Sequence, residues 1–279
     1  MMTMTGGELT EAEYTRFCKL IYKVAGIRIQ GSKRLMVTTR VRRRLRATGI
    51  ATFSAYLTFL ESPAGTSEMP LFVDEMTTNE TYFYRDPHHF EWFGKEYLPE
   101  IIQQAALRKR PKSLRIWSAA SSSGEELYSI ALKVAAAKSQ LAGWNLSLLG
   151  TDLNGTILEA ARNAVYDDRA VRLVSQEERQ LHFSHDPASQ KWSLNRDVKA
   201  YATFKPHNLL EPLKDMPFDC IFIKNVLIYF DEESKKMVVR HLLAALAKGG
   251  YLVVGPSEGI QGMLGALTKH KLWLYQKPV

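Results

Sequence analysis

From Lys112 onward, short apolar runs alternate with segments typical of helices, and no other feature limits the fold as strongly. Short runs that are mostly apolar suit strands buried on both faces of a sheet. They lie at 114–119, 146–152, 218–226 and 251–257, and the helices expected between them lie at about 124–138, 154–163 and 232–247. Such alternation predicts an α/β fold with a doubly wound, mostly parallel sheet. Residues 271–277 predict an antiparallel strand at the end of that sheet.

The chain before Lys112 is expected to be helical, beginning with a small all-α domain at residues 1–70. Thr10 and Glu13 have the spacing of a capping box that begins a first helix. Further helices are expected at about 32–47, 53–60, 70–76 and 87–109. Residues 71–111 would link this domain to a sheet domain at residues 112–279 and complete its pocket. Residues 166–204 interrupt the alternation, and we expect an inserted antiparallel β subdomain there, with a hairpin formed by 191–195 and 198–204.

The positive charge of the chain is concentrated in its first part. Residues 1–60 hold 11 of the 37 Lys and Arg residues but 3 of the 29 acids, a surplus equal to the net charge of +8. A local surplus suggests a local acidic partner. No apolar run approaches the roughly 18 residues that span a bilayer, the first residues lack the features of a signal peptide, and the two cysteines lie far apart. We therefore expect a cytoplasmic protein with no membrane insertion, no disulfide and no metal site.

The segment after the first apolar run has the layout of a dinucleotide-binding turn but not its composition. It contains one glycine, Gly124, and two acids, Glu125 and Glu126, stand where a pyrophosphate would have to bind. Ligands of an open parallel sheet bind beyond the carboxyl ends of its strands, where Asp152 and the stretch 225–229 also lie. This rim of acids and amides suits a cofactor with positive charge and free hydroxyls. S-adenosylmethionine has a sulfonium, an ammonium and a ribose but no phosphate, so we expect it to be the cofactor.

Each of these residues also has a purely structural explanation. Glu125 could be an acid favoured in a first helical turn, and Asn225 could cap the turn before the next helix. Tyr229 could belong to the core. The evidence for a site is that such residues follow successive strands.

Four stretches carry a resemblance to a known family: TNETYFYR at 78–85, WSAASSSGEE at 117–126, NVLIYFD at 225–231 and GPSE at 255–258. In these stretches the chain resembles the CheR-type methyltransferases, which esterify glutamate side chains on bacterial chemotaxis receptors. The resemblance covers nearly the whole chain, including the basic helical start and the inserted subdomain. It implies a protein-glutamate O-methyltransferase whose methyltransferase domain follows a small all-α domain.

The resemblance also implies roles for particular residues. Arg85 would border the methionine part of the cofactor and the reaction centre, Glu125 would meet the charged tail, and Asp152 would hold the ribose. The other implied cofactor contacts are Asn79, Thr81, Asn208, Leu209, Asn225 and Val226. Lys224 and Tyr84 depart from the arginine and phenylalanine that are common in the family, but neither replaces an expected ligand.

The implied reaction is an in-line attack of a glutamate oxygen on the sulfonium methyl, which yields S-adenosylhomocysteine. A glutamate with a pKa of about 4.3 is already ionised at neutral pH, so the reaction needs no general base. Alignment and partial desolvation would then carry catalysis. We expect Arg85 to hold the acceptor carboxylate and Tyr229 to orient it. The alternative for Arg85 is an ion pair with Asp86 or Glu91.

The stretch RLMVTTRVRRRLRA at 34–47 predicts a helix with one apolar and one basic face. The basic residues expected to bind substrate are Arg40, Arg42, Arg43, Arg44 and Arg46. A solvated face or nucleic acid would also explain them, but the aromatic platforms of an RNA binder are not obvious. The resemblance favours the acidic face of a receptor. We therefore expect a monomer that binds the cytoplasmic helical bundle of a methyl-accepting chemotaxis receptor and no nucleic acid.

Two other functions stay open at this point. The first is methylation of nitrogen on RNA or DNA, because the stretch after Asn225 loosely resembles the Asn-Pro-Pro-Tyr strand end of amino-methylating enzymes. The missing prolines count against it. The second is a regulatory module that binds S-adenosylmethionine without transferring the methyl group, and the presence of Arg85 and Tyr229 disfavours it.

Overall fold

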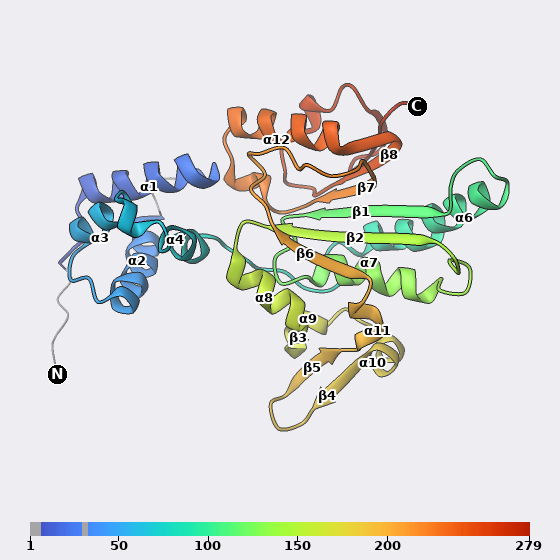
Figure 1. Ribbon diagram of the computed structural model, residues 1–279, viewed down its shortest axis with the longest axis horizontal. Coiled ribbons are helices and arrows are strands. Elements are labelled where there is room, and N and C mark those ends of the chain that lie inside the picture. The colour runs from blue at the N-terminus through green and yellow to red at the C-terminus, as the bar shows by residue number, and fades with distance from the viewer. Residues whose placement is uncertain (1–6, 30–32) are drawn as a thin grey trace.

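The computed structural model describes residues 7–29 and 33–279. A helical unit that extends to residue 76 is followed by a larger unit built around a central sheet (Figure 1). The first residues of the expected all-α domain, and the expected start of its second helix at Ser32, lie outside the described residues.

The helices expected at the start of the chain are confirmed. The helical unit contains α1 (Glu11–Ala25), α2 (Arg34–Thr48), α3 (Phe53–Leu60), the short 3-10 helix η2 (Pro63–Gly65) and α4 (Met69–Met76). The Thr10 hydroxyl accepts the Glu13 N–H at 3.2 Å and the Glu13 carboxylate accepts the Thr10 N–H at 2.9 Å, as a capping box requires. The rings of Phe17, Tyr56 and Phe72 pack with centroids 5.9–6.3 Å apart in a core of the unit's own.

The helix expected at 87–109 is present but not uniform. It consists of α5 (Pro87–Trp92), a π-helical turn η3 (Phe93–Tyr97) and α6 (Leu98–Ala106). The rings of Phe90 and Phe93 both lie 6.2 Å from that of Phe222 in the sheet. These contacts hold the helical part of the linker against the sheet.

The central sheet has seven strands in the order β6-β2-β1-β7-β8-β10-β9 within the described residues. The parallel strands are β1 (Ser113–Ala119), β2 (Asn145–Asp152), β6 (Ala202–Pro206), β7 (Phe218–Ile223) and β8 (Leu246–Val254). The other two, β9 (Thr268–Lys271) and β10 (Leu274–Gln276), are antiparallel to their neighbours. The expected C-terminal antiparallel strand is thus present as β10, but β9 rather than β10 forms the edge.

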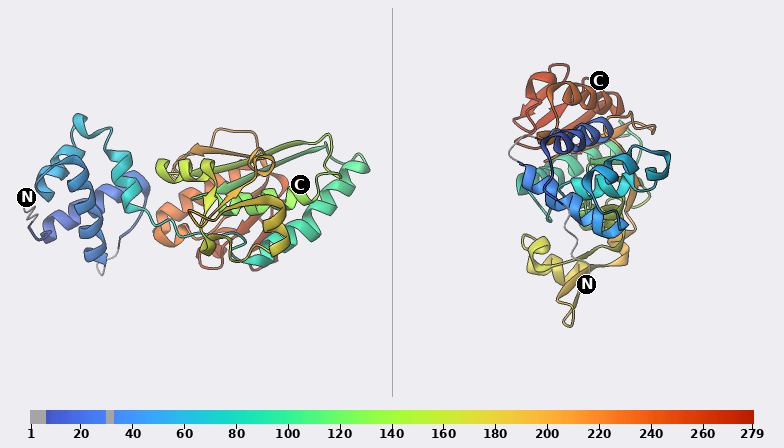
Figure 2. Two further views of the ribbon diagram at one scale, coloured as in Figure 1. Left: turned by 90° about the horizontal axis from the view of Figure 1, so that it is seen from below. Right: turned by 90° about the vertical axis from the view of Figure 1, so that its left-hand side faces the viewer.

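Helices cover both faces of this sheet (Figures 1 and 2). Ile116 and Phe222 belong to a core with α5, α6 and α7 (Glu125–Ala136). Trp117 and Ile221, their neighbours along the strands, belong to a second core with α12 (Glu232–Ala245). Successive strand residues point to opposite faces, so the two cores lie on opposite faces of the sheet, and each is covered by helices. The doubly wound α/β fold is therefore confirmed.

The insertion forms a small antiparallel sheet, but the expected pairing of its strands was wrong. β5 (Lys191–Leu194) pairs with β4 (Phe183–Asp186) and β3 (Val165–Tyr166), and not with residues 198–204. Those residues contribute to α11 (Arg196–Lys199) and to β6 of the central sheet. The Phe204 ring lies 5.5 Å from that of Tyr128 on α7, so β6 is held by the main core. Two short helices, α9 (Asp168–Val171) and α10 (Gln176–His182), complete the insertion.

The helical unit docks on the sheet unit at two places. Near the end of α1, Arg28 N–H donates to the Tyr229 carbonyl at 2.8 Å, and Asn208 Nδ2 donates to the Val24 carbonyl at 2.9 Å. On α4, the carboxylate of Asp74 accepts the first two N–H groups of α8 (Gly155–Asn163) at 3.2 and 3.1 Å. The space between these two contacts is where the site lies.

Candidate active site

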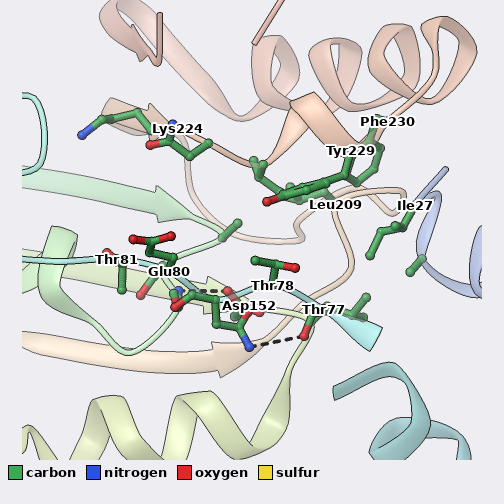
Figure 3. Close-up of a pocket in the computed structure, with 18 of the residues that line it drawn as sticks. Ile27, Thr77, Thr78, Glu80, Thr81, Asp152, Leu209, Lys224, Tyr229 and Phe230 are labelled. Atoms are coloured by element: carbon green, nitrogen blue, oxygen red, sulfur yellow. Dashed lines mark hydrogen bonds between the residues drawn. The ribbon is translucent and has the colours of Figure 1, made fainter. Parts of the chain in front are cut away.

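A cavity lies where the carboxyl ends of β1, β2 and β7 meet the linker and the end of α1 (Figure 3). Ligands of doubly wound folds bind at this edge of the sheet. The expected site residues that line the cavity are Asn79, Thr81, Arg85, Asp152, Asn208, Leu209, Asn225, Val226 and Tyr229. The helical unit adds apolar side chains, among them Ile27 and Met36. Tyr229 and Phe230 lie on the opposite side of the cavity from Asp152.

The loop after β1 turns through three residues of positive φ: Ala120 at 62°, Ser122 at 51° and Gly124 at 92°. A Cβ on Gly124 would lie 3.1 Å from three neighbouring side chains, in a conformation that already favours glycine. The turn directs the Ser122 N–H to Asp152 Oδ2 at 2.9 Å. A backbone amide that would cradle a phosphate in a dinucleotide-binding turn therefore binds a carboxylate of the protein itself.

Asp152 ends β2 as a buried acid whose oxygens are only partly satisfied. Its Oδ1 accepts the Asn154 N–H at 3.0 Å, and its Oδ2 accepts the N–H of Ser122. Burial raises the pKa of Asp152, and the N–H donors of Asn154 and Ser122 oppose this rise. The N–H of Leu153 also donates to this carboxylate. A carboxylate has about four lone-pair sites, so Asp152 can still accept a hydroxyl group from a ligand in the cavity.

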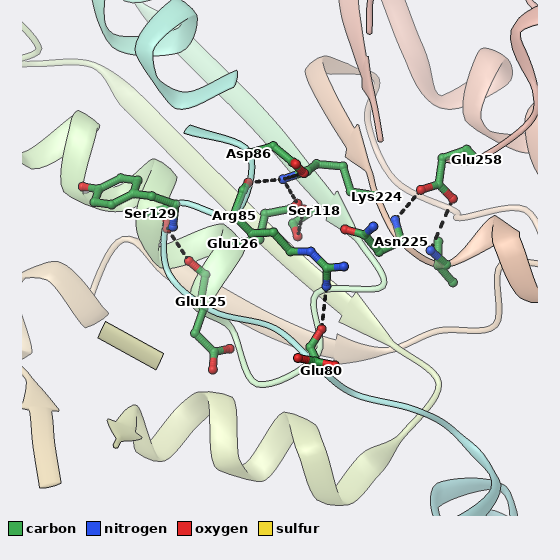
Figure 4. A network of polar contacts seen from close by, with 12 residues as sticks. Glu80, Arg85, Asp86, Ser118, Glu125, Glu126, Ser129, Lys224, Asn225 and Glu258 are labelled. Carbon is green, nitrogen blue, oxygen red and sulfur yellow. Dashed lines mark hydrogen bonds and ion pairs between the residues drawn. The ribbon is translucent and has the colours of Figure 1, made fainter. Parts of the chain in front are cut away.

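Arg85 extends from the linker beside the cavity. Among the residues that the structure describes, its guanidinium makes one hydrogen bond, from Nη1 to the Glu80 carbonyl at 2.7 Å (Figure 4). The alternative ion pairs are not formed. Asp86 pairs with Lys224 at 3.3 Å, and Glu91 pairs with the lysine four residues later at 3.9 Å. A guanidinium has five N–H donors, so Arg85 retains donors for a carboxylate.

The two acids that begin α7 have different surroundings. Glu126 lines the cavity and accepts the Ser118 hydroxyl at 2.8 Å. Glu125 is 3% exposed and lines an adjacent hollow beside the inserted subdomain, which shares Asn79 with the cavity. Burial raises the pKa of Glu125 to about 7, although its carboxylate accepts the Ser123 hydroxyl at 2.7 Å. The cofactor contact of Glu125 therefore stays a prediction.

Comparison with known families decides the class of the protein. A model described as "CheR methyltransferase, all-alpha domain" matches residues 12–77, and one described as "CheR methyltransferase, SAM binding domain" matches residues 79–273. The chain belongs to the CheR family. Its curated relatives include the probable chemotaxis protein methyltransferase of Rhizobium etli, 37% identical over 87% of this chain and 91% of the relative. The chemotaxis protein methyltransferases of Salmonella typhimurium (35% identical, 92% of this chain, 86% of the relative) and Escherichia coli (35%, 90% and 85%) are also similar.

As a CheR-family protein, the chain is a methyltransferase that uses S-adenosylmethionine. The cavity suits this cofactor, because Asp152 offers an unused lone pair to a hydroxyl and the apolar wall around Leu209 and Ile27 suits an adenine. In the part of the chain that the structure describes, no three His, Cys, Asp or Glu residues gather as a metal ion would require. Among the described helices, none combines the length and the hydrophobicity that a membrane span requires.

Two buried charges of this CheR-family site did not stand out as functional in the sequence. The Glu258 carboxylate accepts the N–H groups of Asn225, Val226 and Leu227, the last at 2.7 Å. It thereby fixes a turn in which Asn225 has a positive φ of 60° and which leads to Tyr229. Lys224, just before this turn, is buried between two acids (Figure 4). The GPSE motif was the signal for Glu258, and the arginine common in the family was the signal for Lys224.

Two of the five α2 arginines serve the structure of the CheR-family protein itself. Arg44 donates from Nε and Nη2 to the Glu68 carboxylate at 2.8 and 2.9 Å, and Glu68 also accepts the Tyr56 hydroxyl at 2.7 Å. Arg40 donates to the Met76 carbonyl at 2.6 Å and so holds the start of the linker. The structure thus explains both residues without a partner.

The other three α2 arginines are more accessible to a binding partner. Arg43 is 63% exposed although it pairs with Glu75 at 2.8 Å. Arg46 is exposed, and the Arg42 guanidinium lies 6.0 Å from the centre of the Phe53 ring. Their contact with a substrate stays a prediction.

Proposed function

We propose that this CheR-family enzyme transfers methyl groups to glutamate side chains of chemotaxis-type receptors and so serves sensory adaptation. One observation carries the proposal. Arg85, which has unused donors, and Tyr229 line the same cavity as Asp152. The names of the curated relatives, which are chemotaxis protein methyltransferases, support it.

The residues of the chain would divide the reaction between them. When bound, S-adenosylmethionine supplies a methyl group activated by a sulfonium. Asp152 would hold a hydroxyl of the cofactor, while Asn79, Asn208 and Asn225 would line its path. Arg85 would bind the acceptor carboxylate and Tyr229 would orient it, so that one carboxylate oxygen faces the methyl group. Since that oxygen is ionised at neutral pH, positioning and the exclusion of water suffice, and positioning alone can supply roughly 7–11 kcal/mol.

The charge distribution supports an acidic protein partner. We propose that residues 1–70 recognise the cytoplasmic helical bundle of the receptor through Arg42, Arg43 and Arg46. Residues 71–111 would complete the cofactor pocket, and residues 112–279 would carry transfer, with the protein acting as a cytoplasmic monomer.

One experiment separates this function from its two rivals. The protein is incubated with tritium-labelled cofactor and either receptor-bearing membranes or total RNA, and base-labile methanol is then measured. Receptor labelling that base releases as methanol is expected, because carboxyl methyl esters hydrolyse and methylated nitrogen does not. Base-stable label on RNA would support N-methylation, and cofactor binding without label on either acceptor would support a regulatory module.

Arg85→Ala should lower receptor methylation by about 100-fold, because misalignment of the acceptor has costs of that order. Cofactor affinity measured by calorimetry should stay within a few-fold. The matched control is Arg240→Ala, which removes an exposed arginine on α12. Equal losses of binding and turnover in the Arg85 variant would show that Arg85 serves the cofactor instead.

A further inference from the structure

Lys224 places an ammonium group in the interior beside the cavity, and its side chain is 2% exposed. Burial of a charge is unfavourable unless partners surround it. Three oxygens do so: the Arg85 carbonyl at 2.6 Å, Asp86 Oδ2 at 3.3 Å and Glu126 Oε2 at 3.4 Å (Figure 4). The Phe90 ring centre lies 5.0 Å away. This one cation therefore connects the linker, the first turn of α7 and the end of β7.

The linker atoms that Lys224 contacts belong to a strained turn. Tyr84 and Asp86 have φ values of 57° and 62°, and neither is a glycine. Such conformations persist only where the surrounding structure imposes them. The ammonium binds the carbonyl between these two residues and the carboxylate of the second. It thereby fixes the backbone from which the Arg85 side chain extends toward the cavity.

Glu126 gives Lys224 a second, electrostatic task. This carboxylate lines the cavity, so its charge would repel an acceptor carboxylate that approaches Arg85. The Lys224 ammonium at 3.4 Å compensates that charge. Without it, Glu126 would be left as an uncompensated acid in the wall of the cavity.

We propose that Lys224 is a positioning residue for methyl transfer to an anionic acceptor. It holds the Arg85 turn in place, and it screens Glu126 so that a carboxylate can enter. Lys224 lines the cavity, but its side chain is almost fully buried among its partners, so it acts through these two residues. The inference rests on the proposed function, because only an anionic acceptor needs this screening.

The test compares wild type, Lys224→Met, Lys224→Arg and the double variant Lys224→Met/Glu126→Gln in steady-state methylation of receptor membranes. The matched control is Lys236→Met, since Lys236 forms an exposed ion pair with Glu233 at 3.0 Å. Lys224→Met should lower kcat about 100-fold and raise the KM for receptor several-fold, while the Kd for S-adenosylhomocysteine stays within threefold. Lys224→Arg should restore both constants to within about threefold of wild type, because a guanidinium has donors for the same three oxygens. The double variant should restore KM but not kcat, since it removes the repelling charge without fixing the turn.

These outcomes separate positioning from general stability. A purely structural role would lower the folded fraction and leave KM unchanged, so an unaltered KM in Lys224→Met overturns the screening. If Lys224→Met does not fold, the double variant decides, and a kcat within twofold of wild type there overturns the positioning. If the wild type methylates receptor and Lys224→Met is equally active, this inference is refuted while the proposed function stands. Methylation of RNA but not of receptor by the wild type refutes the proposed function and this inference with it.

Discussion

The raised pKa of Glu125 makes the stability of the cofactor-free enzyme depend on pH within a defined window. Burial raises the pKa of this carboxyl from 4.5 to about 7. Between these values the unfolded chain has lost a proton that the folded protein keeps. The unfolded state then binds fewer protons, so stability is full below pH 4.5, falls as pH rises through the window and levels off above about pH 7.

The size of this effect follows from the two pKa values. Each pKa unit corresponds to about 1.4 kcal/mol, so a rise from 4.5 to about 7 amounts to about 3 kcal/mol. Screening by solvent reduces this little, because Glu125 is almost fully buried. Glu125→Gln keeps the size of the side chain and an acceptor for the Ser123 hydroxyl but cannot ionise. We expect the variant to lack this part of the pH dependence.

The assay is urea unfolding of wild type and Glu125→Gln at intervals from pH 4.5 to 8. The variant should gain about 3 kcal/mol relative to wild type across this range, because other titrating groups cancel in the difference. Glu177→Gln, which replaces an exposed acid on α10, is the matched control for the loss of one carboxyl group. Curves for Glu125→Gln that stay parallel to wild type within about 0.5 kcal/mol would refute the reasoning, since Glu125 would then ionise as it does in water.

Cofactor binding extends the same test. If Glu125 meets the positively charged tail of S-adenosylmethionine, it must ionise on binding, so binding at pH 6 should release a proton and affinity should rise toward pH 7. Calorimetry in two buffers of different ionisation enthalpy measures that proton. The Glu125→Gln variant should release none. Absence of proton release from wild type would indicate that Glu126, the acid that lines the cavity, meets the charge instead.

Three further predictions follow from named contacts. Asp152→Ala should weaken binding of S-adenosylhomocysteine by about 2 kcal/mol in calorimetry, and unchanged affinity in a folded variant would remove Asp152 from the site. Arg44→Met should destabilise the protein by about 3 kcal/mol in urea unfolding, because Glu68 would be left as a buried, unpaired acid. A loss of unfolding free energy below about 1 kcal/mol would contradict that reason. Reversal of Arg42 and Arg46 to glutamate should raise the KM for receptor without changing cofactor affinity, and wild-type activity should fall with salt, whose screening length is about 10 Å at 0.1 M. If receptor methylation and its salt dependence are unaffected, α2 presents only a solvated face.

The central sheet could be predicted because its signal is local. A run such as 220–223 is apolar at successive positions, and only a strand with both faces covered buries all of them. The insertion carried no such signal. Residues 202–206 alternate as any strand does, and whether they pair with β5 or with β2 depends on Phe204 packing against Tyr128, a residue far away in sequence. Propensity predicts that a strand forms, while tertiary packing selects its partner.

In the candidate site, too, some positions could be predicted from the sequence and others depend on tertiary packing. The positions of Asp152 and Asn225 follow from the rule that strand ends form the ligand edge, so the sequence suffices to bring them together. Glu125 and Glu126 are neighbours on a helix, where successive side chains point about 100° apart. One of them must turn away from the cavity, and the sequence alone does not determine which. Among the α2 arginines, likewise, Arg44 is distinguished by its contact with Glu68, a buried acid just before α4.

Lys224 is the residue for which sequence reasoning was least sufficient, because its role depends on charges that are distant in the chain. The carbonyl that it binds belongs to a residue 139 positions earlier. A lysine at a strand end would ordinarily indicate an anionic ligand, yet here the protein itself supplies the anions, Asp86 and Glu126. The rim of the cavity is therefore less negative than its composition suggests. That difference matters for the chemistry, since the cavity has to attract a cofactor with positive charge and still admit an acceptor that is itself an anion.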